Sequence, residues 1–106
     1  MPTERRVHFV ERLGLMWQLA PNSSEWESGY WWRIGLANAE ALKGGRIYFH
    51  KSQAEPSYCG GIIIGHRIEQ GEKYRDRYVF KFRPSGDCKG VSAGPDNWFR
   101  GRKLVL

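Results

Sequence analysis

The segment from residue 73 to residue 83 reads Lys73-Tyr74-Arg75-Asp76-Arg77-Tyr78-Val79-Phe80-Lys81-Phe82-Arg83. Because side chains alternate across a β-strand, this segment predicts a strand with one cationic face, at the odd positions, and one largely aromatic face. The aromatic face can enter a core, whereas the cationic face must meet water or an anion. Positive charges about 7 Å apart along the strand suit a phosphate backbone. A solvated outer face of a half-buried strand is the alternative interpretation.

The composition is that of one small globular protein, so residues 1–106 are predicted to form a single domain. The chain has 106 residues and 41% hydrophobic side chains, enough for one core. The formal net charge is +6, and residues 43–106 carry 13 basic against 6 acidic side chains. Such an excess favours an anionic partner, and nucleic acid, either RNA or DNA, is the expected one.

The sequence carries no signal for secretion or for membrane insertion. The N-terminal residues lack the uninterrupted apolar run of a secretory signal, and no apolar run approaches the roughly 20 residues of a transmembrane helix. Two cysteines, Cys59 and Cys88, do not make a disulfide framework, which fits a reducing compartment. We therefore expect a cytoplasmic protein without membrane contact and without a bound cofactor. The oligomeric state is left open.

Strands are predicted at residues 30–34, 46–50, 62–68, 73–83 and 102–106, with the third and fourth paired antiparallel across a turn at 70–72. A short helix is expected over residues 36–43, with Asn38 as its cap and Gly44 as its end. Residues 53–61 read as a loop, and residues 4–20 are ambiguous between a short strand and a helical stripe. These elements predict an α+β fold with a small curled β-sheet or barrel and one or two short helices.

A longer pattern spans a helix, a glycine turn, a strand that ends in an aromatic residue and histidine, a proline-containing loop and an aliphatic strand. It reads Ala41-Leu42-Lys43-Gly44-Gly45-Arg46-Ile47-Tyr48-Phe49-His50-Lys51-Ser52 and then Glu55-Pro56-Ser57-Tyr58-Cys59-Gly60-Gly61-Ile62-Ile63-Ile64-Gly65. The stretch resembles the PUA-like superfamily, most closely its EVE and ASCH branches, to which YTH domains are related. The resemblance implies a barrel-like domain that takes a nucleobase, often a modified one, into an aromatic-lined pocket.

The candidate base pocket consists of four aromatic residues and a histidine. Tyr48 and His50 share one face of their predicted strand, opposite Ile47 and Phe49. Base stacking is worth about 1–3 kcal/mol per aromatic ring, so two rings could anchor one base. The alternative is that all of these side chains are core aromatics with satisfied polar tips. The full candidate set is Trp31, Trp32, Tyr48, His50 and Tyr58.

The candidate phosphate contacts are cations from three parts of the chain. The run of residues 97–103 interleaves aromatic and basic residues around a glycine, an arrangement that can hold a single strand by stacking and charge. A solvated C-terminal segment is the alternative interpretation. The full candidate set is Lys51, Arg75, Arg77, Lys81, Arg83, Arg100, Arg102 and Lys103.

Two other functions stay open at the level of sequence. Some small ASCH-type proteins are amidohydrolases of modified nucleosides, and the resemblance would assign their lysine, hydroxyl and carboxylate to Lys51, Ser52 and either Glu55 or Glu69. A lysine that acts as a base has to be buried, which sequence does not reveal. The second alternative is a protein-interaction module whose basic face meets an acidic partner.

A metal site is not expected. The possible ligands are spread along the chain without the tight spacing of zinc motifs: His50, Cys59, His66 and Cys88.

Taken together, the cationic strand, the aromatic candidates and the resemblance predict a nucleic-acid-binding domain that recognises a base, ordinary or modified, in an aromatic pocket flanked by cations.

Overall fold

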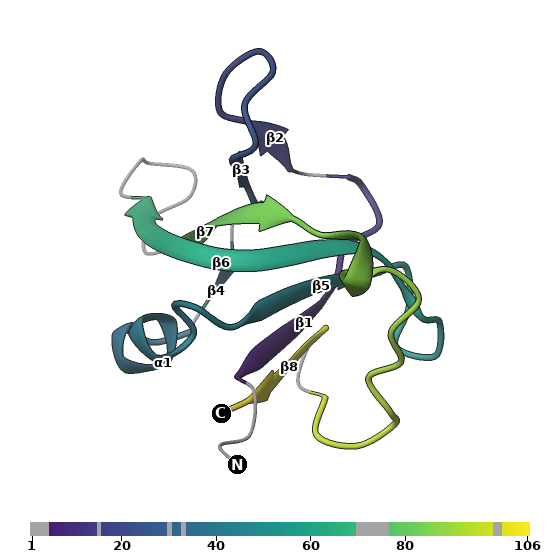
Figure 1. Cartoon of the computed structure of the whole chain (residues 1–106). Helices are drawn as coiled ribbons and strands as arrows, with labels where there is room; N and C mark the ends of the chain where they lie inside the picture. The colour runs from purple at the N-terminus through teal and green to yellow at the C-terminus, as the bar shows by residue number, and fades with distance from the viewer. Residues whose placement is uncertain (1–4, 15, 30, 33, 70–76, 99–100) are drawn as a thin grey trace.

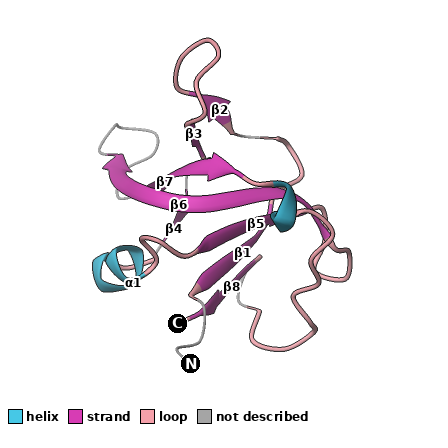
Figure 2. Cartoon of the chain, in the orientation of Figure 1, coloured by secondary structure: helices cyan, strands magenta, loops and turns pink. Residues whose placement is uncertain are grey.

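A computed structural model of the chain describes residues 5–14, 16–29, 31–32, 34–69, 77–98 and 101–106, the side chains of Trp31 and Trp32 excepted. Its elements are β1 (Arg6–Val10), β2 (Trp17–Gln18), β3 (Trp26–Glu27), β4 (Trp31–Trp32), α1 (Leu36–Ala41), β5 (Arg46–His50), β6 (Ser57–Glu69), β7 (Arg77–Pro84), the 3-10 helix η1 (Gly86–Cys88) and β8 (Arg102–Val105). The structure is thus mostly β, with one short α-helix among the described residues (Figure 2).

All eight strands belong to one mixed sheet. Seven of them follow the order β2-β3-β7-β6-β5-β1-β8, and β4 pairs with β7 beside β3 (Figure 1). Strands β1 and β5 are parallel, and the other pairs are antiparallel. The sheet is open, so the expected curled sheet or barrel is wrong. Closing a sheet needs edge strands long enough to pair with each other, and β2 has only two residues.

The predicted strands largely coincide with the observed ones. Strand β5 occupies the predicted range, and β6 and β7 pair antiparallel as expected. Strand β8 pairs with β1 at the edge of the sheet. The ambiguous segment 4–20 contains β1 and β2, with no helix in its described residues. Of the strand expected over 30–34, the described residues Trp31 and Trp32 form β4 and Ile34 lies outside it. The expected turn at 70–72 lies outside the described residues.

The helix begins at Leu36 and stops before Gly44 as predicted, but its N-cap is not the predicted residue. Gly44 has a φ of 86°, the left-handed conformation expected where a helix stops. Gly35 occupies the N-cap position, whereas Asn38 lies inside the helix. The side chain of Asn38 donates from Nδ2 to the carbonyl oxygen of Ile34 at 2.8 Å. The predicted cap is therefore wrong, because the amide finds a backbone partner one turn back instead.

Strand β6 begins at Ser57, so the loop expected over residues 53–61 is wrong in its second half. Gly60 and Gly61 lie inside the strand, where neighbouring backbones approach closely. A Cβ atom on Gly60 would collide with the carbonyl oxygen of Ile47, and one on Gly61 would collide with that of Arg83. These glycines therefore permit close strand packing, and the sequence pattern reads as a loop only because glycine is also common in turns.

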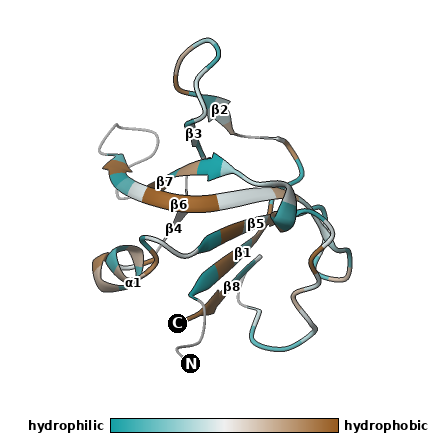
Figure 3. Cartoon of the chain, viewed as in Figure 1, coloured by the Kyte–Doolittle hydropathy of each residue, from teal (hydrophilic) through white to brown (hydrophobic). Residues whose placement is uncertain are grey.

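The hydrophobic core lies on one face of the sheet. In Figure 3 the middle of β6 is hydrophobic, as expected for a strand that crosses this core. The helix covers the same face, since Ala39 and Leu42 are buried in the cluster. The largest side chains of this cluster are four phenylalanines, and burial of large aromatic side chains is a strong source of stability in a small domain. The cluster consists of Val7, Phe9, Ile34, Ala39, Leu42, Ile47, Phe49, Ile63, Phe80 and Phe82.

The close approach at Gly61 gives a test of the fold. We expect Gly61→Ala to lower the free energy of unfolding by about 2 kcal/mol or more, because the added methyl group must displace the backbone of β7. Gly65→Ala is the matched control on the same strand, where a Cβ atom would meet nothing within 4 Å. Urea denaturation followed by tryptophan fluorescence measures both variants. Equal stability of the two would contradict the strand packing described here.

Candidate nucleic-acid interface

Strand β7 has the two faces that the alternation predicted. Phe80 and Phe82 are buried in the hydrophobic core. Lys81 and Arg83 extend from the opposite face, which we name the outer face of the sheet, since they occupy the alternate positions of the strand. The separation into an aromatic and a cationic face is therefore confirmed for the part of the segment that the structure describes.

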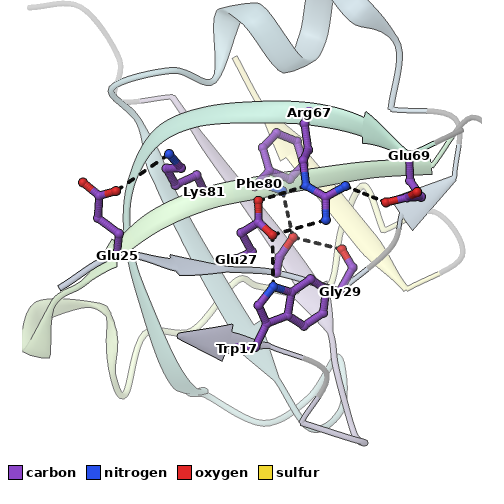
Figure 4. Close-up of polar contacts among 9 residues, drawn as sticks. Trp17, Glu25, Glu27, Gly29, Arg67, Glu69, Phe80 and Lys81 are labelled. Carbon is purple, nitrogen blue, oxygen red and sulfur yellow. Dashed lines mark hydrogen bonds and ion pairs between the residues drawn. The ribbon is translucent and has the colours of Figure 1, made fainter. Parts of the chain in front are cut away.

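Lys81 and Arg83 of β7 form ion pairs on the outer face. The carboxylate of Glu25, in the segment before β3, lies 3.7 Å from Nζ of Lys81 and 3.6 Å from Nη2 of Arg83. Figure 4 shows the first of these ion pairs. The pairing register also places Glu27 directly opposite Lys81. Acidic residues from the first part of the chain thus offset the positive charge of β7.

A second ionic cluster on the outer face joins β2, β3 and β6. Glu27 accepts hydrogen bonds from Nε1 of Trp17 at 3.0 Å and from Nε of Arg67 at 3.0 Å (Figure 4). Nη1 of Arg67 also forms an ion pair with Oε2 of Glu69 at 2.5 Å. Burial alone would raise the pKa of Glu27, but the hydrogen bonds from Arg67 and Trp17 outweigh it and hold that pKa below its usual value. The cluster joins three strands through side-chain contacts, and it is not a free cationic surface.

A row of arginines crosses the outer face on three different strands. In the sheet register Arg83 of β7 lies opposite Ile62, Ile62 lies opposite Arg46 of β5, and Arg46 lies opposite Arg6 of β1. Directly paired residues share a face, so all three guanidinium groups leave the sheet on the same side. Neighbouring strands are about 5 Å apart, which places Arg46 about 5 Å from Arg6 and about 10 Å from Arg83 at the backbone.

The part of the sheet formed by β1, β5 and β8, which holds two of these three arginines, carries charged side chains of positive sign only. Strands β1, β5 and β8 contain no aspartate or glutamate. Like charges on directly opposite residues repel each other, so the Arg6 and Arg46 pair favours an anion nearby. These three strands carry four cations: Arg6, Arg46, Arg102 and Lys103.

Next to the arginine row, a cluster of rings is buried on the outer face. The imidazole of His8 stacks on Tyr48, with ring centroids 4.6 Å apart and planes 13° apart. His50 lies 5.0 Å from His8, and Trp98 approaches both histidines edge-on. Both histidines are 0% exposed and Tyr48 is 5% exposed. Buried polar rings of this kind need hydrogen-bond partners to be tolerated.

A directed chain of hydrogen bonds satisfies the two histidines. Nε of Arg6 donates to Nε2 of His8 at 3.2 Å, so this nitrogen is the acceptor. Nδ1 of His8 then donates to Nε2 of His50 at 2.8 Å. Nδ1 of His50 donates to the carbonyl oxygen of Glu55 at 2.8 Å. Because a carbonyl only accepts and a guanidinium only donates, this assignment is the one that satisfies all four ring nitrogens with both rings neutral.

The surroundings of the pair favour the neutral form of both rings. Burial lowers the pKa of His8 to about 3, and the charges of His50, Arg6 and Lys103 act in the same direction. Burial also lowers the pKa of His50, against a smaller opposite effect of its hydrogen bond to Glu55. Both rings are therefore neutral at physiological pH.

The segment after η1 covers the ring cluster. It follows the β5–β1–β8 part of the sheet as a long loop (Figure 1). The backbone N–H of Ser57 donates to the carbonyl oxygen of Val91 at 2.9 Å. Nζ of Lys103, which lies opposite His8 in the register, donates to the carbonyl oxygen of Ala93. The loop is thereby attached to β6 and β8, and it brings Trp98 against the histidines.

An open apolar pocket of about 200 Å³ lies on the core side of the sheet. The thiol of Cys59 lies 3.7 Å from the sulfur of Met16 inside it. Burial raises the pKa of Cys59 to about 11, so the thiol is protonated and a poor nucleophile at neutral pH. The lining offers few polar groups for the edges of a base. It consists of Met16, Trp26, Cys59, Gly60, Phe82 and Pro84.

The residues predicted to form a base pocket do not come from neighbouring strands. Tyr48 and His50 lie on β5, as predicted on one face, whereas Trp31 and Trp32 lie on β4, and β6 and β7 separate the two strands. The side chains of both tryptophans lie outside the described residues. The hydroxyl of Tyr58 donates to the carbonyl oxygen of Glu11 at 2.7 Å, and its ring packs against the hydrophobic core.

The predicted phosphate contacts are also divided among different places. Nζ of Lys51 lies 5.8 Å from the centre of the Tyr58 ring, in the loop after β5. Lys103 faces the ring cluster, whereas Arg102 lies opposite Phe9 in the register, on the core side at the sheet edge. Arg77 begins β7 and is half-buried. Two further predicted cations lie outside the described residues: Arg75 and Arg100.

The residues assigned to a hydrolase by resemblance do not gather in a cavity among the described residues. Lys51 is exposed. The hydroxyl of Ser52 accepts a hydrogen bond from the backbone of Glu55 at 3.3 Å, as in a local turn. Glu69 is engaged by Arg67 on β6. A lysine base would need a buried amine, which this loop does not provide.

Metal and membrane features are absent from the described part of the chain. No three histidine, cysteine, aspartate or glutamate side chains gather there as ligands for a metal ion. None of the helices that the structure describes is long and apolar enough to cross a membrane. Cys59 and Cys88 are free thiols.

Three residues of the cationic outer face were not found by the sequence reasoning: Arg6, His8 and Arg46. A local signal for them exists, since Arg6 and His8 alternate in one strand as Arg46, Tyr48 and His50 do in another. That signal becomes visible only when the two strands are known to be neighbours. Their pairing connects positions 40 residues apart, which alternation within one segment does not reveal.

The chain was compared with protein-family models, with curated proteins and with solved structures, and none of them matches. The resemblance to the PUA-like superfamily therefore stays a prediction from the sequence.

The buried histidine pair predicts sensitivity to acid. Because folding lowers both histidine pKa values, the unfolded chain binds more protons below pH 6.5, and the free energy of unfolding must fall as the pH falls. Below the ordinary histidine pKa of 6.5 the slope contributed by His8 should approach about 1.4 kcal/mol per pH unit, and His50 should add to it in the same direction. The carboxylate of Glu27 does not contribute to this slope, because its lowered pKa changes the stability mainly below its ordinary pKa of 4.5.

Urea denaturation at a series of pH values measures this slope. His8→Gln should make it shallower, whereas His66→Gln, the control at the remaining histidine on β6, should leave the acid-dependent loss of stability in place. An unchanged slope in His8→Gln would contradict a neutral, buried pair.

Proposed function

We propose that this domain binds nucleic acid through the outer face of its sheet. The observation that carries the proposal is the row of Arg6, Arg46 and Arg83 on one face of three strands. Arginine is suited to phosphate because its planar guanidinium donates two parallel hydrogen bonds. The absence of carboxylates from β1, β5 and β8 makes this end of the sheet attractive to a polyanion.

The ion pairs of β7 are compatible with such a role. The side chain of Arg83 is 60% exposed and that of Lys81 is 42% exposed. Exposed ion pairs are worth between about 0 and 1 kcal/mol, so a phosphate can compete with Glu25 for both cations at little cost. The positive charge that the sequence places on β7 would then add to the arginine row.

Recognition of a base, and of a modified base in particular, stays a prediction. It would draw on Trp31, Trp32 and Tyr58 as well as on Tyr48 and His50, and the latter two are buried against other rings. The PUA-like assignment, the amidohydrolase alternative and a cytoplasmic location stay predictions too. The free thiols fit a reducing compartment.

The salt dependence of binding tests the proposed function. We expect the protein to bind labelled single-stranded RNA, single-stranded DNA or duplex DNA with an affinity that falls steeply between about 50 and 200 mM salt. Arg46→Gln and Arg83→Gln should each weaken binding to all sequences alike and lower the salt slope by about 1. Fluorescence anisotropy across a salt series measures both quantities.

Lys43→Gln is the matched control, because it removes the same charge from an exposed position next to α1, the helix on the core side of the sheet. Affinity that is flat across the salt series would contradict a phosphate role. Binding of polyglutamate with equal affinity would favour the alternative of an acidic protein partner.

A further inference from the structure

Arg6 and His8 form a side-chain pair on the outer face of β1. They are two residues apart in one strand and therefore point to the same side. Nε of Arg6 donates to Nε2 of His8 at 3.2 Å. This bond uses the Nε donor of the guanidinium and leaves the fork formed by its two Nη atoms outside the bond.

His8 cannot turn freely, because it is fixed on three sides. Its ring stacks on Tyr48, its Nδ1 donates to His50, and Trp98 meets it edge-on. The charged and titratable groups that surround it come from three strands: Arg6 on β1, Arg46, Tyr48 and His50 on β5, and Lys103 on β8.

The hydrogen-bond chain allows only one placement of the hydrogen atoms on the two imidazoles. If Nε2 of His8 carried the hydrogen, it would face the N–H of Arg6, and two donors would oppose each other. The carbonyl of Glu55 fixes the other end of the chain, because it holds the hydrogen of His50 on Nδ1. The acceptor that faces Arg6 is thus determined by the whole chain.

We propose that His8 is a positioning residue for Arg6, which it holds through Nε so that both Nη atoms present a fork to one phosphate of the bound nucleic acid. This inference rests on the proposed function and deepens it. An arginine side chain that is already oriented loses less conformational freedom when it binds, which strengthens the contact without adding any new one. His50 and Glu55 act one step further away, by fixing the tautomer of His8.

Two substitutions at position 8 separate positioning from packing. His8→Phe keeps a ring against Tyr48 but removes the acceptor for Arg6. His8→Gln loses the ring but offers an amide oxygen as an acceptor. The proposal expects His8→Phe to lose affinity several-fold at unchanged salt and His8→Gln to recover most of that loss. A role in packing alone would give the opposite order and would overturn the proposal.

A double-mutant cycle tests whether His8 acts through Arg6. Arg6→Ala should weaken binding about tenfold, and His8→Phe should have no further effect once Arg6 is gone. Losses that multiply in the double variant would overturn the proposal while leaving nucleic-acid binding itself intact. A wild-type protein that binds no RNA or DNA would overturn the proposed function together with this inference.

A further variant covers the case in which His8→Phe fails to fold, which thermal unfolding in the binding buffer reveals. Arg6→Lys keeps the positive charge but has neither the Nε donor nor the fork. The proposal then expects Arg6→Lys to lose affinity several-fold while retaining the wild-type salt slope, because the charge stays and only the oriented fork is lost. Binding of Arg6→Lys at wild-type affinity would overturn it.

Discussion

The parallel pairing of β1 with β5 is the constraint on which the rest of the structure depends. Five consecutive pairs, from Arg6 opposite Arg46 to Val10 opposite His50, fix the register of the two strands. This register places Phe9 and Phe49 on the core side, where their rings lie 6.3 Å apart. A shift by one residue would exchange the two faces and bury the arginines in the core. The core and the outer face are thus consequences of the same pairing.

The sheet is divided electrostatically into two parts. Around β2, β3, β6 and β7, glutamates and cations occur together and form the ion pairs centred on Glu25 and Glu27. Around β1, β5 and β8, cations occur without carboxylates in the strands. Lys81 and Arg83, from the most basic segment of the sequence, thus lie beside a carboxylate, whereas β1, β5 and β8 contain none. This division is the basis of the proposal that the outer face binds an anion.

The buried histidines carry a cost that their hydrogen bonds offset. Two neutral imidazoles enter a site without water contact, and each of their ring nitrogens has a partner in the described structure. A fully satisfied polar network specifies one arrangement, whereas a partly satisfied one would be worse than an apolar core. The same network that makes the fold sensitive to acid also orients Arg6. Stability and the proposed binding role therefore draw on the same contacts.

The sequence by itself determined several local features: the strands β5, β7 and β8 and most of β6, which face of β5 and β7 enters the core, and where α1 ends. These follow from a period of two along a strand and from the conformational freedom of Gly44, both of which are local properties. Only the tertiary structure decided which strands are neighbours. It therefore decided that Glu25 meets the cations of β7, that Arg6 lies beside Arg46, and that β4 and β5 are not adjacent. Strand order and register depend on how the whole core packs, and no single segment contains that information.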